Sequence, residues 1–162
     1  MRPKPNTLIV VAGPTASGKT ALAIQIAKAV DGEIVSADSM QIYRGVDIAT
    51  AKPTPEELAA VPHHLIGFLP MDRAFSVADY AELARKEIND ILSRGKVPVL
   101  CGGTGLYIKA IVDNVQYSEA ITGDEALRER LRQLAEREGN DALWRRLEAM
   151  DPETAKRIHP NN

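Results

Sequence analysis

Short apolar runs and longer amphipathic stretches alternate along the first two thirds of the chain. Four β-branched or apolar runs predict buried strands at residues 7–12, 33–36, 64–69 and 97–101. Helical spacing predicts helices at residues 20–30, 76–94 and 106–112, and Ser76 and Gly95 are placed to cap and to end the longest of them. Strands that alternate with helices predict an α/β fold, in which a parallel sheet carries helices on both faces.

The pattern changes in the last part of the chain. From residue 124 onward, leucines recur at helical spacing among charged residues, with no apolar run that would predict a strand. We therefore expect an α/β core at residues 1–118, incomplete at its C-terminal end, and a small all-helical insertion or appendage at residues 119–162. Residues 38–55 are polar and lack a lasting period, which predicts a long loop.

Composition narrows the class of protein. The 162 residues are 44% hydrophobic and 26% charged, as in a soluble globular protein. Cys101 is the single cysteine, which excludes an internal disulfide or a cysteine-based zinc site and fits a reducing cytosol. The apolar run at residues 8–12 is too short for a signal peptide or a membrane span. Because the net charge is −2, an RNA partner would have to be held by local groups.

One motif carries specific chemistry. It matches the P-loop pattern in full, between a predicted strand and a predicted helix: Gly13-Pro14-Thr15-Ala16-Ser17-Gly18-Lys19-Thr20. Such a loop turns its backbone N–H groups toward a phosphate at a helix N-terminus. Lys19 supplies a mobile cation, and the Thr20 hydroxyl is placed to ligate Mg²⁺. An accidental glycine-rich turn is the alternative, and the strand-and-helix context argues against it.

Two further loops are predicted to meet the P-loop. Asp38 and Ser39 follow the second strand, and Gly102 to Gly105 follow the strand at residues 97–101, so both loops leave the carboxyl ends where ligands of open α/β sheets bind. Asp38 could ligate Mg²⁺ through water or accept a proton from a nucleophile. It could equally belong to a simple turn or helix cap. The glycines could admit a ligand, with Thr104 as a hydrogen-bonding group, or only form a tight turn.

Other polar residues have a structural interpretation. His63 and His64 are adjacent, so in a strand their side chains diverge and cannot chelate one metal ion together. Trp144 lies on a leucine-rich helix and is expected in its core. The arginines after residue 124 suggest a nucleic-acid face, but glutamates interleave with them, and composition alone favours a solvated, salt-bridged helix pair.

Four stretches together resemble one family, the tRNA dimethylallyltransferases: residues 13–20, Asp38-Ser39-Met40-Gln41-Ile42-Tyr43, Thr50-Ala51-Lys52-Pro53 and Gly102-Gly103-Thr104-Gly105-Leu106-Tyr107. The triplet His63-His64-Leu65 and the closing Ile158-His159-Pro160-Asn161 add to the match, which spans residues 7–162. The resemblance implies a cytoplasmic, monomeric P-loop enzyme of tRNA processing. Its reaction would transfer a dimethylallyl group from dimethylallyl diphosphate to N6 of the adenosine 3′ of the anticodon, in tRNAs that read codons beginning with U.

The resemblance also assigns roles. The P-loop would hold the diphosphate leaving group in place of a hydrolysed nucleotide, with Lys19, Thr20 and Mg²⁺ neutralising its charge. Asp38 resembles the general base for the N6 proton, and together with Ser39, Met40 and Gln41 it resembles the adenosine-contacting segment. Thr104 resembles a residue that contacts the tRNA, and Arg128 resembles the arginine of the helical insertion that contacts the anticodon stem-loop.

The family pattern continues beyond the His-Pro-Asn stretch, so the chain is expected to be part of a longer enzyme. We expect it to bind diphosphate with Mg²⁺ while transfer stays near background. Two alternatives remain open at this stage: a small-molecule or nucleotide kinase, which would bind ATP at the same P-loop, and a relative that binds diphosphate or RNA without chemistry.

Overall fold

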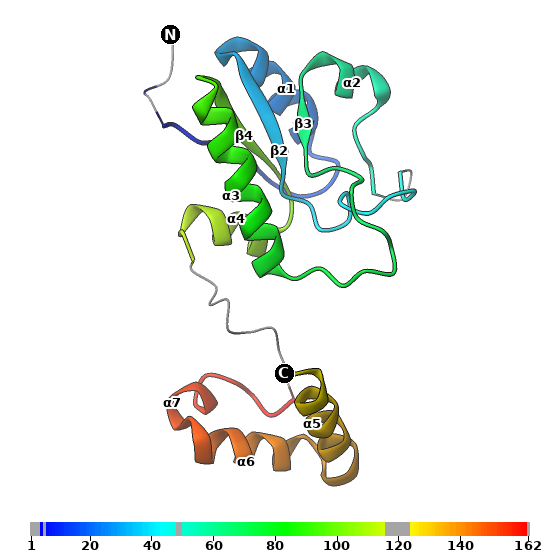
Figure 1. Ribbon diagram of the computed structural model, residues 1–162, viewed down its shortest axis with the longest axis vertical. Helices are drawn as coiled ribbons and strands as arrows, with labels where there is room; N and C mark the ends of the chain where they lie inside the picture. The colour runs from blue at the N-terminus through cyan, green and yellow to red at the C-terminus, as the bar shows by residue number, and fades with distance from the viewer. Residues whose placement is uncertain (1–3, 5, 48–49, 116–123, 162) are drawn as a thin grey trace. The chain divides into compact units, whose positions relative to one another are not determined.

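A computed structural model describes residues 4, 6–47, 50–115 and 124–161 (Figure 1). The chain divides into two compact units, Met1–Tyr117 and Ser118–Asn162. The first unit contains a four-stranded sheet whose paired strands are all parallel, in the order β1-β4-β2-β3. Its strands are β1 (Ile9–Ala12), β2 (Gly32–Ser36), β3 (His63–His64) and β4 (Val97–Gly102).

Four helices accompany this sheet: α1 (Lys19–Val30), α2 (Pro55–Ala60), α3 (Val77–Ser93) and α4 (Gly105–Val112). The longest has the ends that its sequence predicts. The Ser76 hydroxyl accepts a hydrogen bond from the Asp79 N–H, and the Asp79 carboxylate accepts one from the Ser76 N–H in return. After Arg94, Gly95 takes a positive φ of 74°, and its N–H donates to the Leu92 carbonyl.

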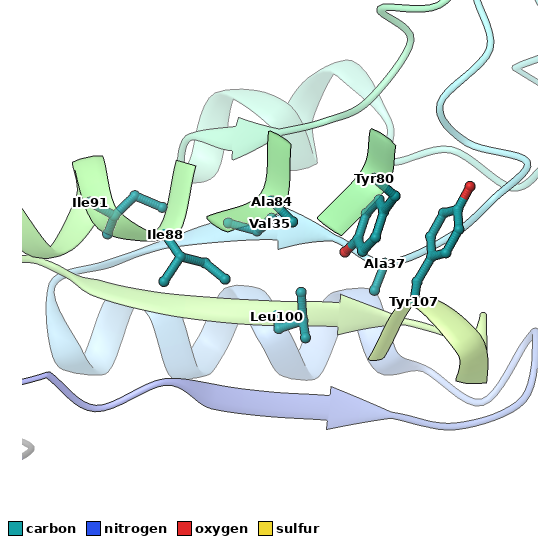
Figure 2. Packing of buried hydrophobic residues seen from close by; sticks show 8 residues of the cluster. All are labelled: Val35, Ala37, Tyr80, Ala84, Ile88, Ile91, Leu100 and Tyr107. Atoms are coloured by element: carbon teal, nitrogen blue, oxygen red, sulfur yellow. The ribbon is translucent and has the colours of Figure 1, made fainter. Parts of the chain in front are cut away.

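Two apolar clusters place helices on both faces of the sheet. On one face, Val35 of β2 and Leu100 of β4 pack with α3 and with Tyr107 of α4 (Figure 2). The Tyr80 and Tyr107 rings stack there with centroids 3.8 Å apart, and the Tyr80 hydroxyl donates to the Ser36 carbonyl at 3.0 Å. On the other face, Ile34 of β2 and its pairing partner Val99 of β4 pack with α1. The strands are apolar on both sides, as the sequence predicts for a buried parallel sheet.

The predicted third strand at residues 64–69 is wrong in its extent. Only His63 and His64 pair with β2, because Leu65 and Gly67 take positive φ values of 61° and 58°, which end the extended backbone. Leu69 then forms an isolated parallel bridge with Tyr43.

Helix α2 was not predicted, although its start signal is present. The Thr54 side chain and the Glu57 side chain form a reciprocal capping box, and Pro55 occupies the first helical position.

The described residues of the second unit form three helices and no strand: α5 (Glu125–Glu138), α6 (Asn140–Met150) and α7 (Pro152–Ala155). Trp144 is half-buried, and its indole N–H donates to the carbonyls of Ala155 and Ile158 at 3.2 and 2.8 Å. Its ring lines an apolar hollow together with leucines of α5 and α6. Trp144 therefore anchors the segment after α7 and is only half-buried, whereas the sequence predicts it in the core of its helix.

Candidate functional site

A pocket of about 390 Å³ lies at the carboxyl ends of the strands of the first unit. It is lined by the P-loop and the start of α1 (residues 15–21), by Asp38, Met40 and Gln41, by Thr50, Ala51 and Glu57, and by Cys101 and Gly102. Residues from four separate stretches of sequence therefore form one pocket. This is the place where open α/β sheets bind their ligands.

The P-loop backbone curls as its glycines require. Gly18 precedes α1 with φ 77°, a left-handed conformation that suits glycine, and Ala16 also has a positive φ of 62°. The Lys19 ammonium folds back and donates to the Pro14 carbonyl of the same loop. Among the described residues no carboxylate forms an ion pair with Lys19, so its charge is available to an anion in the pocket.

Asp38 uses one carboxylate oxygen to shape its own turn. Oδ1 accepts hydrogen bonds from the backbone N–H groups of Met40 and Gln41, at 2.9 and 3.4 Å. Within the described part of the chain, Oδ2 has no hydrogen-bond partner. The turn that was the alternative explanation for Asp38 is thus present, and it leaves a second oxygen for chemistry.

Thr104 connects the loop after β4 to the loop after β2. Its Oγ1 accepts from the Ser39 N–H at 2.9 Å and donates to the Ser39 hydroxyl at 3.2 Å. The backbone continues the connection, because the Thr104 N–H donates to the Ala37 carbonyl at 3.0 Å. Gly102 permits this approach, since a Cβ there would lie closer than 3.0 Å to three backbone atoms of Ala37. Thr104 and Ser39 are absent from the pocket lining but hold Asp38 in position.

Gln41 and Lys52 fix the far wall of the pocket. The Gln41 amide group donates to the carbonyls of Thr50 and Ala51, at 3.3 and 3.0 Å. The Lys52 side chain is 8% exposed, and its ammonium donates to the Tyr43 carbonyl at 2.5 Å and to the Asp47 carboxylate at 2.6 Å. Lys52 therefore folds the loop, and the adjacent Thr50 and Ala51 face the pocket.

Cys101, on β4, also lines the pocket. Burial raises its pKa, while the nearby charge of Lys19 acts in the opposite direction. The thiol therefore stays protonated near neutral pH and acts here as a small apolar group.

The oxygen atoms of the pocket suit a metal ion that is held mainly by the phosphates of a bound substrate. No group of three or more histidine, cysteine or acidic side chains among the described residues could hold a metal ion. Mg²⁺ commonly binds through one or two protein oxygens together with substrate phosphates. Thr20 and Asp38 line the pocket and offer such oxygens.

The structure brings most of the predicted site residues together. Of the residues assigned to the P-loop, Gly13 and Pro14 lie outside the pocket lining. Arg128 is exposed on α5, in the second unit. Sequence reasoning assigns no role to Thr50, Ala51, Glu57 and Cys101, which line the pocket, or to Lys52, which supports it.

The histidines and the arginines behave as the structural interpretations predict. His64 lies between two carboxylates, with Nε2 2.8 Å from Glu33 Oε2 and Nδ1 2.9 Å from Glu87 Oε2. In the second unit, Arg132 pairs with Glu129 and Arg137 pairs with Glu138.

In the part of the chain that the structure describes, no helix has the length and apolar character needed to cross a membrane.

Comparison with known proteins places the chain in a family. The sequence model of the family described as IPP transferase matches residues 41–162. The chain is 54% identical over 159 residues to a tRNA dimethylallyltransferase of Exiguobacterium, covering 98% of this chain and 51% of that protein. It is 50% identical over 155 residues to the tRNA dimethylallyltransferase of Bacillus subtilis, covering 96% and 49%. The chain thus spans about half the length of the curated relatives it matches.

Solved structures show the same relationship. A tRNA isopentenylpyrophosphate transferase from Bacillus halodurans superposes with a TM-score of 0.68 at 45% identity, over 97% of this chain and 52% of that one. A eukaryotic dimethylallyltransferase, solved acting on tRNA, superposes with a TM-score of 0.82 at 30% identity, over 96% and 38%. With the P-loop pocket and the parallel sheet, these matches show that the chain belongs to the IPP transferase family.

Proposed function

We propose that this chain carries the donor-binding and base-bearing part of a tRNA dimethylallyltransferase. The reaction joins the five-carbon group of dimethylallyl diphosphate to N6 of the adenosine 3′ of the anticodon. The observation that carries the proposal is the single pocket in which Lys19, Thr20 and Asp38 converge. The names of the relatives support the type of reaction, and the geometry of the pocket supports the roles proposed for its residues.

The diphosphate end of the donor fits the P-loop side of the pocket. As the carbon–oxygen bond of the donor breaks, negative charge grows on the departing diphosphate. The Lys19 ammonium can leave the Pro14 carbonyl for this anion, and the P-loop N–H groups and the N-terminus of α1 add partial positive charge. Mg²⁺, held by Thr20 and by diphosphate oxygens, would add further positive charge when bound.

The acceptor fits the Asp38 side of the pocket. The N6 amine of adenine is a weak nucleophile because its lone pair is delocalised into the ring. As N6 bonds to the donor carbon, one N6 proton must leave, and Oδ2 of Asp38 can accept it while Oδ1 stays engaged in the turn. Met40, which is 54% exposed in the pocket wall, offers an apolar surface for the base or the prenyl chain. The same proposal includes contacts with the tRNA by Ser39, Gln41, Thr104 and Arg128.

Two substitutions test the two halves of the site. In the chain extended to the full length of its relatives, Lys19→Ala should abolish transfer. It should also weaken pyrophosphate binding in the presence of Mg²⁺ more than it weakens tRNA binding, as measured by calorimetry. Lys28→Ala, on the exposed side of the same helix, is the matched control. Equal loss of both affinities, or loss of neither, would count against the assignment.

Asp38→Asn should leave pyrophosphate binding nearly unchanged. In the chain extended to the full length of its relatives, it should slow single-turnover transfer of radiolabelled prenyl group to undermodified tRNA by about 10²- to 10⁴-fold. Asp72→Asn, at an exposed loop position, is the control. A rate within about threefold of wild type would remove the proton-acceptor role. ATP turnover with a small acceptor, and no transfer to tRNA, would favour a kinase.

A further inference from the structure

A small cavity lies directly beside the proposed donor pocket. Its volume is about 20 Å³, and it shares Thr20, Gln41 and Cys101 with the larger pocket. Ser36 and His63 complete its polar walls, and the remaining walls are apolar. A space of this size holds one water molecule and no organic ligand.

The ring of His63 presents a bare acceptor in this region. Its Nδ1 lies 2.8 Å from the Val61 carbonyl, which can only accept, so Nδ1 carries the proton. Burial lowers the pKa of His63, so the ring is neutral near pH 7 and Nε2 is an acceptor. Nε2 is buried, and none of the described residues donates a hydrogen bond to it. Buried polar atoms in native proteins are nearly always paired, so Nε2 needs a donor.

Ser36 provides an independent observation. The residue is 2% exposed, and its hydroxyl faces Gln41 Oε1 at 3.5 Å, far longer than the usual O–H···O distance of about 2.7–2.8 Å. Gln41 cannot simply move closer, because its amide nitrogen holds the carbonyls of Thr50 and Ala51. A buried donor and a partly buried acceptor therefore lie slightly too far apart for a normal hydrogen bond.

We propose that this cavity is a binding site for a single structural water molecule. The water donates one hydrogen to His63 Nε2 and the other to Gln41 Oε1, and it accepts the hydrogen of the Ser36 hydroxyl. This arrangement satisfies the three groups at once, and a water with about three partners is typical of buried sites. The walls contain no carboxylate, so they do not suit a divalent cation.

The position of the water gives it a role in the fold of the site. It joins β3, through His63, to the end of β2 and to the loop that begins at Asp38. Gln41 is the shared residue, because it also holds the Thr50–Ala51 wall of the donor pocket. The water thus supports that wall from behind and does not take part in the chemistry.

Nuclear magnetic resonance on the ¹⁵N-histidine-labelled chain tests the proposal. We expect the His63 ring to have a protonated Nδ1 and a hydrogen-bonded, unprotonated Nε2. Its ring protons should show cross-peaks to water with the sign pattern of a long-lived bound molecule. The exposed His159 ring is the internal control and should show only rapidly exchanging water. A protonated Nε2, or an Nε2 without a hydrogen bond, would overturn the proposal.

The Ser36 hydroxyl is a second exchangeable proton near the ring, so Ser36→Ala separates the two sources. The cross-peak should persist in this variant, and its loss would assign it to the hydroxyl and overturn the proposal. A crystal structure of the unsubstituted chain decides the same point if the variant does not fold. One oxygen within about 3.2 Å of Nε2 that belongs to water supports the site, and a side-chain oxygen in that place rejects it.

Discussion

Substitution of Glu33 by glutamine should remove a large part of the stability of the first unit in a pH-dependent way. Glu33 lies on β2 and is 3% exposed. Arg94 holds both of its carboxylate oxygens, at 2.5 and 2.8 Å, and His64 lies 2.8 Å from Oε2. These hydrogen bonds, with that of Arg94 the strongest, lower the pKa of Glu33 from 4.5 to about 2 in spite of its burial.

The size of the stabilisation by Glu33 and its pH dependence follow from the pKa of this carboxyl in the unfolded and in the folded state. The lowering of the Glu33 pKa from 4.5 to about 2 corresponds to about 3 kcal/mol of folding free energy, since a pKa difference of one is worth about 1.4 kcal/mol. Because the folded-state pKa is the lower one, this stabilisation is fully present above pH 4.5 and is lost as the pH falls toward 2. Glutamine keeps the shape of the side chain but accepts no such charge-assisted bonds. The variant should therefore lose about 2–3 kcal/mol at pH 7 and much less near pH 2.

Urea unfolding monitored by near-ultraviolet circular dichroism measures this loss of stability, because the buried Tyr80–Tyr107 pair reports on the first unit. Fluorescence of Trp144 reports on the second unit, where no change is expected. Glu82→Gln, at an exposed position of α3, is the matched control. A difference between Glu33→Gln and wild type that is equally large at pH 7 and near pH 2, or below about 0.5 kcal/mol at pH 7, would refute the electrostatic reasoning.

Two further substitutions address the connection between the loops. Gly102→Ala should cost at least about 2 kcal/mol in thermal unfolding, because its Cβ would overlap the backbone of Ala37. Gly105→Ala, which meets no atom within 4 Å at the start of α4, should be neutral or stabilising, and equal costs would reject the steric argument. Thr104→Val should lower the stability measured in thermal unfolding by about 1 kcal/mol, because Ser39 loses its hydrogen-bond partner and the loop after β2 is released. Thr104→Ser should retain most of this stability. No loss in Thr104→Val would reject the role of the hydroxyl, and an equal loss in Thr104→Ser would show that the methyl group matters as much.

The sequence predicts an element well where local signals decide its ends. Helix α3 begins after a serine cap and ends before a glycine in the left-handed region, and both positions are visible in the sequence. The strands at residues 7–12, 33–36 and 97–101 appear within two residues of their expected bounds, since apolar runs flanked by turn residues leave few alternatives. The P-loop likewise lies between β1 and α1, as its pattern requires.

Prediction fails where the backbone departs from what the residue type prefers. Leu65 is a poor candidate for a positive φ, so the run from His64 to Leu69 resembles a strand that the chain does not form. Helix α2 shows the opposite error. Its six residues have no buried member, so they lack the hydrophobic period of a helix, and only the capping box of Thr54 and Glu57 reveals it.

The residues of the candidate site also differ in whether the sequence predicts them. Lys19, Thr20 and Asp38 were predicted because each follows a strand, and the carboxyl ends of parallel strands share one edge. Thr50 and Ala51 follow no strand. They reach the pocket because the Gln41 amide, about ten positions earlier, binds their carbonyls, and single side-chain bonds of this kind have no periodic signature in a sequence.

The order of the strands is the part of the site that sequence reasoning could not supply. Three loops at one edge do not meet unless their strands are neighbours, and β4, the last strand along the chain, lies between β1 and β2. The register then sets Gly102 beside Ala12 and Cys101 beside Ser36, so the loop after β4 touches both others. Only a residue without a Cβ lets Ala37 come close enough for the Thr104 N–H to reach its carbonyl. The position of Asp38 in the pocket thus depends on a glycine more than sixty residues away, through a long-range pairing that only the folded sheet creates.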